Sequence, residues 1–168
     1  DNGEIYIFLA SSLGSDTTLD HLNADYTISA YYSYDSDGTG YSVAYIDDIS
    51  GDGLPEVATV VPTESSVAPG EVRIFYSSTI LSDSSLTGSE ADIVIDNVKN
   101  EVINAGDVDG DGEPDLLVGR DEEYVALFLN SSLTSASSLD AETDADYTFE
   151  ASEDNDKLGI RYALAGNR

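Results

Sequence analysis

The sequence lacks several residue types, and each absence excludes a class of function. Its 168 residues include no Cys, Met or Trp, one His, and 6 Lys plus Arg against 34 Asp plus Glu, giving a formal net charge of −28. Without Cys, neither a disulfide framework nor a thiolate metal site can form. The single imidazole, His21, excludes sites that need two and leaves a Ser-His-Asp triad dependent on one residue. The shortage of cations excludes a nucleic-acid-binding surface.

Long apolar runs are also missing. No segment approaches the roughly 20 apolar residues that span a bilayer, and an anionic membrane surface would repel this chain, so we expect no membrane insertion. The absence of an initial Met and of a signal segment predicts a mature or trimmed piece. A folded core is still expected, because 40% of the residues are hydrophobic. Bound cations, high salt or both must offset the self-repulsion of the acidic chain.

An internal repeat organises the chain. The segments DISGDGLPEVATV (48–60) and DVDGDGEPDLLV (107–118) begin 59 positions apart, with Gly-Asp-Gly and Pro in register. An Ala-Asp pair followed by a short apolar stretch recurs three times, at 24–28, 91–95 and 145–149. The predicted units are a partial first repeat, two repeats that each carry an acidic loop, and the start of a further one: 1–40, 41–100, 101–160 and 161–168.

The composition of each repeat predicts four short antiparallel strands, and therefore an all-β protein. Runs such as 71–76 and 124–129 are rich in β-branched and aromatic residues, and Gly, Pro, Asp and Ser clusters separate them. No segment sustains a helical period, so no long helix is expected. The Ser-rich stretches 77–89 and 131–138 are predicted to be exposed loops, and an insertion is expected in the loop around Pro62–Pro69.

The acidic loops carry the clearest chemistry. In 107–115, acidic side chains occupy positions 1, 3, 5 and 9, and Gly112 at position 6 permits the positive φ of a tight loop. A hard divalent cation takes six to eight oxygens at about 2.3–2.6 Å, and alternate side chains can wrap around it. The predicted ligands, with the main-chain carbonyl at position 7 of each loop, are Asp48, Ser50, Asp52, Leu54 and Glu56, and Asp107, Asp109, Asp111, Glu113 and Asp115.

Ca²⁺ is favoured over Mg²⁺ because the donors are numerous, all oxygen, and include main chain. The first loop has fewer charges, so we expect it to bind more weakly. An EF-hand is excluded, because that loop ends in a bidentate Glu at position 12, where Thr59 and Val118 stand here. The alternative is a pair of Asp/Gly-rich turns without metal. Four acids within nine residues repel one another, and their repetition at the same offset favours the metal site.

The motif Asp-x-Asp-x-Asp-Gly-x-Pro-Asp at 107–115, followed by Leu-Leu-Val-Gly119, resembles the FG-GAP repeats of integrin α-subunit β-propellers and of related bacterial and archaeal surface proteins. The resemblance implies that each repeat is a four-stranded blade and that the acidic loop holds Ca²⁺ between its first two strands. It also implies an extracellular or cell-surface location. Two departures are Lys99, where the other copies have Gly, and Arg120-Asp121, which replaces the Ala-Pro of the name motif.

The length then bears on function. A closed propeller needs at least four blades, and fewer than three repeats are present, so we expect an incomplete propeller or an open repeat array within a larger functional object. The expected function is a calcium-stabilised structural or adhesive role with a protein or glycan partner, not catalysis. The alternatives are a self-assembling subunit of an extracellular filament, formed through unpaired strand edges, and an accessory domain of a polysaccharide-acting enzyme.

Other residues invite functional interpretations that we consider weaker. His21 lies in an acidic loop without a counterpart in the other repeats, so we do not expect a catalytic role. The Tyr31–Tyr34 cluster is interpreted as packing rather than as a sugar platform, and Asp144 and Asp146 as solvated loop charges. Asn130-Ser-Ser forms an N-glycosylation sequon.

Overall fold

The structure, a computed structural model, describes residues 3–14, 18–30, 38–62, 70–120 and 124–152. The predictions for Tyr31–Tyr34, for 63–69 and for 161–168 lie outside these residues. The elements, in chain order, are β1 Glu4–Ile7, a 3-10 helix at His21–Asn23, β2 Tyr26–Ser29, β3 Ser42–Ile46, β4 Glu56–Val61, β5 Gly70–Phe75, α1 Ser77–Ser82, β6 Ser85–Thr87, a 3-10 helix at Gly88–Glu90, β7 Ile93–Val98, β8 Val102–Gly106, β9 Asp115–Gly119, β10 Tyr124–Phe128, α2 Asn130–Leu133, β11 Ser138–Asp140 and β12 Tyr147–Glu150.

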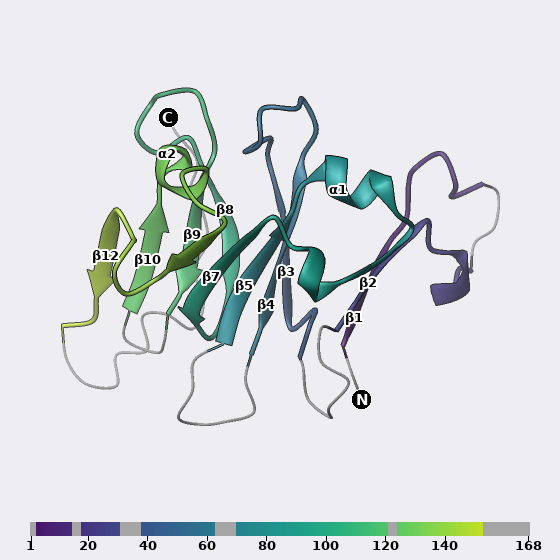
Figure 1. The fold of residues 1–168 in the computed structure, drawn as a ribbon, viewed down its shortest axis with the longest axis horizontal. Helices are drawn as coiled ribbons and strands as arrows, with labels where there is room; N and C mark the ends of the chain where they lie inside the picture. The colour runs from purple at the N-terminus through teal and green to yellow at the C-terminus, as the bar shows by residue number, and fades with distance from the viewer. Residues whose placement is uncertain (1–2, 15–17, 31–37, 63–69, 121–123, 153–168) are drawn as a thin grey trace.

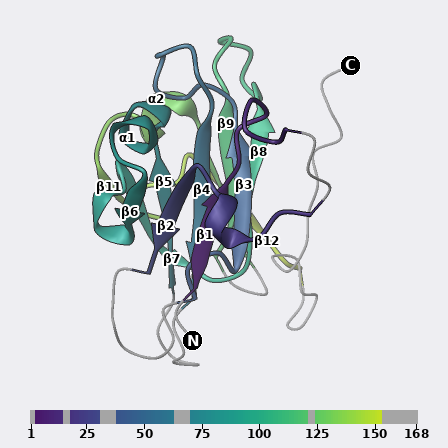
Figure 2. The same ribbon diagram turned by 90° about the vertical axis from the view of Figure 1, so that its right-hand side faces the viewer.

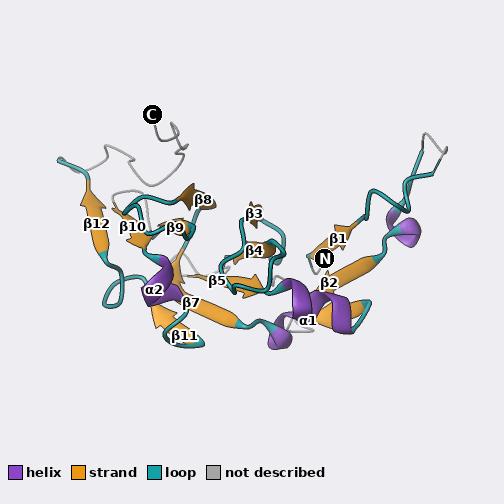
Figure 3. Cartoon of the chain, turned by 90° about the horizontal axis from the view of Figure 1, so that it is seen from above, coloured by secondary structure: helices purple, strands orange, loops and turns teal. Residues whose placement is uncertain are grey.

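These strands form three sheets that stand side by side in a curved row (Figures 1 and 3). The first sheet has the order β1-β2-β6, the second β11-β7-β5-β4-β3, and the third β12-β10-β9-β8. In the second and third sheets, four consecutive long strands pair antiparallel, as the sequence predicts. The all-β class is therefore confirmed, two of the sheets contain four antiparallel strands each, and the described strands form no closed sheet.

Two short strands cross from one sheet to the one before it. β6 pairs parallel with β2, and β11 pairs parallel with β7. β6 lies within the Ser-rich stretch 77–89, and β11 begins at Ser138, where the stretch 131–138 ends, so the prediction that these stretches are exposed loops is wrong in part. Each stretch is held by a buried apolar residue of its short helix and by one of the strand that follows: Ile80 and Leu86, and Leu133 and Leu139.

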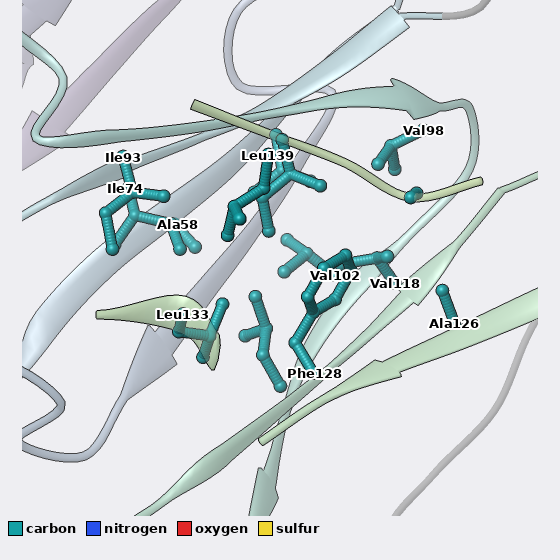
Figure 4. Close-up of a cluster of buried hydrophobic side chains, with 14 of the residues drawn as sticks. Ala58, Ile74, Ile93, Val98, Val102, Val118, Ala126, Phe128, Leu133 and Leu139 are labelled. Atoms are coloured by element: carbon teal, nitrogen blue, oxygen red, sulfur yellow. The ribbon is translucent and has the colours of Figure 1, made fainter. Parts of the chain in front are cut away.

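The core lies between neighbouring sheets. The larger cluster joins the second and third sheets, where Ile74 and Ile93 face Val118 and Phe128, and Leu133 of α2 closes one side (Figure 4). The smaller cluster joins the first and second sheets through Ile5, Ile28, Phe75, Ile80 and Leu86. Figure 2, viewed from the first-sheet end, shows β1 and β2 in front of the second sheet. Each repeat therefore buries its apolar face only against its neighbours.

The connection between β4 and β5 is longer than that between β9 and β10, as the sequence predicts. β4 ends at Val61 and β5 begins at Gly70, whereas β9 ends at Gly119 and β10 already begins at Tyr124. The longer connection contains the expected insertion, whose residues 63–69 are not described. None of the helices in the described part of the chain is long and apolar enough to cross a bilayer.

Candidate metal centres

The first acidic loop connects β3 to β4. Asp48 organises its turn: one carboxylate oxygen accepts the N–H groups of Gly51 at 2.7 Å and Asp52 at 3.0 Å, and the other accepts that of Gly53 at 2.7 Å. Gly51 and Gly53 have φ values of 78° and 86°, which side chains rarely adopt. The Ser77 hydroxyl of α1 donates to the Pro55 carbonyl. The loop is thus held from within and anchored to the following helix.

Glu56, at the start of β4, is fully buried although it is acidic. Its carboxylate accepts the Ile49 N–H at 2.9 Å and the Ser50 hydroxyl at 2.8 Å. Burial raises the pKa of Glu56, and the charges of Asp48 and Asp52 raise it further, against the lowering effect of the two hydrogen bonds. A positive charge at this point would favour the ionised carboxylate.

The second loop, between β8 and β9, repeats this geometry. Asp107 accepts the N–H groups of Gly110 at 2.6 Å and Gly112 at 3.0 Å, and these glycines have φ values of 86° and 98°. Asp115 stands where Glu56 stands in the first loop and is likewise fully buried. Its carboxylate accepts the Val108 N–H at 2.6 Å, as Glu56 accepts that of Ile49.

In each loop three carboxylates converge. Oxygens of Asp48, Asp52 and Glu56 lie within 4.8 Å of one another, and so do oxygens of Asp107, Asp109 and Asp115. Two oxygens that both contact one Ca²⁺ at 2.3–2.6 Å are at most about 5 Å apart. The donor sets therefore fit a hard cation in both charge and spacing.

The structure places the remaining predicted ligands beside these groups. Ser50 donates to Glu56 in the first loop. Asp111 lies outside the converging set of the second loop, and its carboxylate accepts the Glu113 N–H at 2.8 Å. Leu54 makes the corresponding bond to Asp52 at 2.8 Å. Positions 1 and 9 contribute a carboxylate in both loops. The third carboxylate comes from position 5 in the first loop, Asp52, and from position 3 in the second, Asp109.

Two asparagines link the loops to each other. The backbone N–H of Asn130, at the start of α2, donates to Asp115 at 2.9 Å, and its side-chain amide donates to the Ile49 carbonyl of the first loop at 3.2 Å. The Asn104 amide on β8 donates to Asp47 beside the first loop at 2.8 Å. The side-chain amide of Asn130, where the sequon would carry a glycan, thus also donates a hydrogen bond to the first loop.

A second set of aspartates has a structural role that the sequence interpretation missed. The Asp of each Ala-Asp pair accepts the N–H of a residue one or two positions after a strand and the hydroxyl of the residue three positions beyond that donor; we call this arrangement the Asp bracket. The bonds measure 2.7 and 2.6 Å at Asp25, 2.7 and 2.9 Å at Asp92, and 2.8 and 2.8 Å at Asp146. The three-fold recurrence of Ala-Asp is the signal that could have revealed it.

Asp144 and Asp146 are exposed, as the sequence interpretation expects, but that interpretation misses the hydrogen bonds that both carboxylates accept. Asp146 forms the third bracket, and Asp144 accepts the Asp140 N–H at 2.8 Å. His21 lies exposed in a 3-10 helix, with its ring 5.7 Å from that of Tyr6. The Tyr6 ring is the one side-chain contact described for His21.

The comparison with known protein families bears on the third sheet. A family model described as the FG-GAP repeat matches residues 101–136, which contain β8, the second acidic loop, β9, β10 and α2. The chain therefore carries an FG-GAP repeat, as its acidic motif predicts. A search of curated proteins gave no match.

Proposed function

We propose that this chain is an extracellular, calcium-stabilised β-repeat protein with a structural or adhesive role. The observation that carries the proposal is the buried carboxylate at position 9 of both acidic loops, with two further carboxylates inside the span of one calcium shell. Among the described residues neither Glu56 nor Asp115 forms an ion pair. Taking a carboxylate out of water is costly unless a positive charge compensates.

Ca²⁺ would supply that positive charge. In the second loop Asp107, Asp109 and Asp115 would hold it, with Asp111 and the Glu113 carbonyl as further donors. In the first loop Asp48, Asp52 and Glu56 would hold it, with Ser50 and the Leu54 carbonyl. Because each loop joins the first two strands of its sheet, binding there would couple calcium to the stability of the repeat.

The location and the role rest on weaker support. FG-GAP repeats are typical of extracellular or surface proteins, which supports the proposed location. The acidic groups of both loops are engaged in holding the loops, which supports a structural rather than a catalytic role. Nothing described favours the accessory domain of a polysaccharide-acting enzyme.

Thermal melting with calcium and with a chelator tests the proposal. We expect the midpoint to fall clearly when the metal is removed. The double variant Asp107→Asn/Asp111→Asn should lose more of this response than Ser50→Ala, because it removes two charges rather than one neutral donor. Mg²⁺ at the same concentration is the matched control for ionic strength. An unchanged midpoint on chelation would contradict calcium stabilisation.

A further inference from the structure

Both acidic loops lie at the same end of their sheets (Figures 1 and 2), and hydrogen bonds join the first loop to the segments that flank the second. Two asparagines make these bonds. Asn104 lies on β8, which leads into the second loop, and Asn130 begins α2, whose first N–H is bonded to the end of that loop. Their side chains reach groups that lie 57 and 81 positions earlier in the sequence. The two candidate metal sites are therefore connected across the boundary between two sheets.

Asn130 connects the buried carboxylates at position 9 of the two loops. Its backbone N–H donates to Asp115 at 2.9 Å, and its side-chain amide donates to the Ile49 carbonyl at 3.2 Å. The N–H of Ile49 in turn donates to Glu56 at 2.9 Å. Ile49 is 2% exposed and packs in the larger core cluster, so it cannot shift without disturbing the packing between the sheets. A change in how Asp115 is held therefore reaches Glu56 through two intervening residues.

Asn104 connects the beginnings of the two loops. Its side-chain oxygen accepts the Gly106 N–H at 2.8 Å, directly before position 1 of the second loop. Its side-chain nitrogen donates to the Asp47 carboxylate at 2.8 Å, directly before position 1 of the first loop. One planar amide thus contacts the entry residue of both loops.

From these two links we infer that the loops bind calcium cooperatively, with Asn104 and Asn130 as the positioning residues that carry the coupling. A cation in the second loop would fix both of its ends, and the two amides would then hold the first loop in its binding arrangement. The next cation would meet a loop that is already ordered, and its binding would cost less conformational entropy. Because binding free energies are linked, a cation in the first loop should favour the second loop by the same factor. The inference rests on the calcium sites proposed above and adds a dependence of each site on the other.

The charge of a bound cation acts in the opposite direction. Each Ca²⁺ makes its surroundings less negative, which weakens the attraction of the other loop for a second cation. This effect acts through space and is screened by salt, since the Debye length falls to about 3 Å at an ionic strength of about 1 M. The ordering of a loop by neutral amides does not depend on that field. The coupling should therefore be positive in high salt.

The equivalent position in the second repeat shows that the link depends on the residue and not on the fold alone. Tyr76 and Leu129 supply the N–H groups of their Asp brackets, and the residues that follow them are Ser77 and Asn130. The Ser77 hydroxyl donates to the Pro55 carbonyl in the loop of its own repeat. The longer Asn130 side chain instead reaches the loop of the preceding repeat. Shortening this side chain should therefore remove the link and leave the strands in place.

Calcium titration calorimetry in about 1 M NaCl tests the coupling. Asp52→Asn leaves the second loop to bind and Asp109→Asn leaves the first, and each asparagine keeps an oxygen that can accept the backbone N–H bonded there. The coupling factor is the product of the two stepwise association constants of the intact chain, divided by the product of the two single-site constants. We expect a factor of at least about 5. With Asn104→Ala/Asn130→Ala added to all three proteins, the factor should fall to about 1.

Asn23→Ala is the matched control, because the Asn23 amide accepts the Asp20 N–H at 3.0 Å in the 3-10 helix before β2, and this variant should keep the full coupling factor. Hydrogen exchange gives a second measurement that a purely structural role of the amides would not change. In the Asp52→Asn protein, calcium in the second loop should slow the exchange of the Ile49 N–H. Adding Asn130→Ala should abolish that slowing.

The outcomes separate this inference from the calcium sites themselves. A coupling factor of 1 in an intact chain that fills both sites would overturn the coupling and leave the sites standing. A factor that survives the loss of both amides would show that Asn104 and Asn130 do not carry it. Absence of calcium binding in the intact chain would contradict the proposed sites, and the coupling with them.

Discussion

Glu56→Gln is the substitution that most sharply separates a calcium ligand from a structural carboxylate. In the metal-free protein the change removes a buried charge that lies near Asp48 and Asp52. The amide oxygen can still accept from the Ile49 N–H, now 2.9 Å from the carboxylate. The lost charge-assisted bond and the relieved burial of charge act in opposite directions, so we expect the metal-free stability to change by no more than about 1 kcal/mol.

The calcium-bound protein should respond differently. A site held at a calcium concentration 100 times its dissociation constant adds about 2.7 kcal/mol to the free energy of unfolding. In a chain of this size 1 kcal/mol corresponds to about 2–4 °C in the melting midpoint, so each site should contribute about 5–10 °C. Glu56→Gln should abolish the contribution of the first loop and leave that of the second.

Circular dichroism suits the measurement, because the chain has no Trp to report by fluorescence. Asp115→Asn is the matched change in the second loop, and it should remove the larger part of the calcium response if the more acidic loop binds more tightly. A Glu56→Gln protein with the full calcium shift would refute the role of Glu56 as a ligand. A midpoint that falls equally with and without calcium would show that Glu56 serves only the structure of the loop.

Two further substitutions test contacts that do not involve the metal directly. Asp92→Ala removes bonds of 2.7 and 2.9 Å to the Tyr76 N–H and the Thr79 hydroxyl, so urea unfolding should show a loss of about 3 kcal/mol, and an unchanged midpoint would contradict the Asp bracket. Asn130→Ala removes the 3.2 Å bond to the Ile49 carbonyl; calorimetric titration should show weaker calcium binding at the first loop while the second is little changed, and equal affinities in both proteins would exclude a link between the loops.

The long strands and the acidic loops could be predicted because their signals are local. The apolar runs at 71–76 and 124–129 correspond to β5, Gly70–Phe75, and β10, Tyr124–Phe128. The acidic loops carry glycines at the positions where the backbone takes a positive φ, such as Gly112. In both cases the residues that determine the conformation lie within the segment itself.

The crossing strands and the Asp brackets could not be predicted in this way. β6 has three residues, and its one buried side chain, Leu86, finds its partners on β2, far away in the sequence. A three-residue strand with a single apolar residue has no period to detect. Asp92 likewise accepts hydrogen bonds from Tyr76 and Thr79, which are 16 and 13 residues away in the sequence. Nothing in the intervening residues indicates that these groups meet. Tertiary contacts decide both features.

The negative charge of the chain divides into parts that respond to different cations. Two calcium ions would offset only four units of the net charge of −28. The bracket aspartates are stabilised by N–H and hydroxyl donors instead, and the Ser12 hydroxyl and the Leu9 N–H lower the pKa of Asp25. The remaining exposed carboxylates repel one another and are screened by monovalent salt. Calcium should therefore raise the melting midpoint even in high salt, whereas monovalent salt should raise the midpoint of the chelated chain by screening the exposed carboxylates.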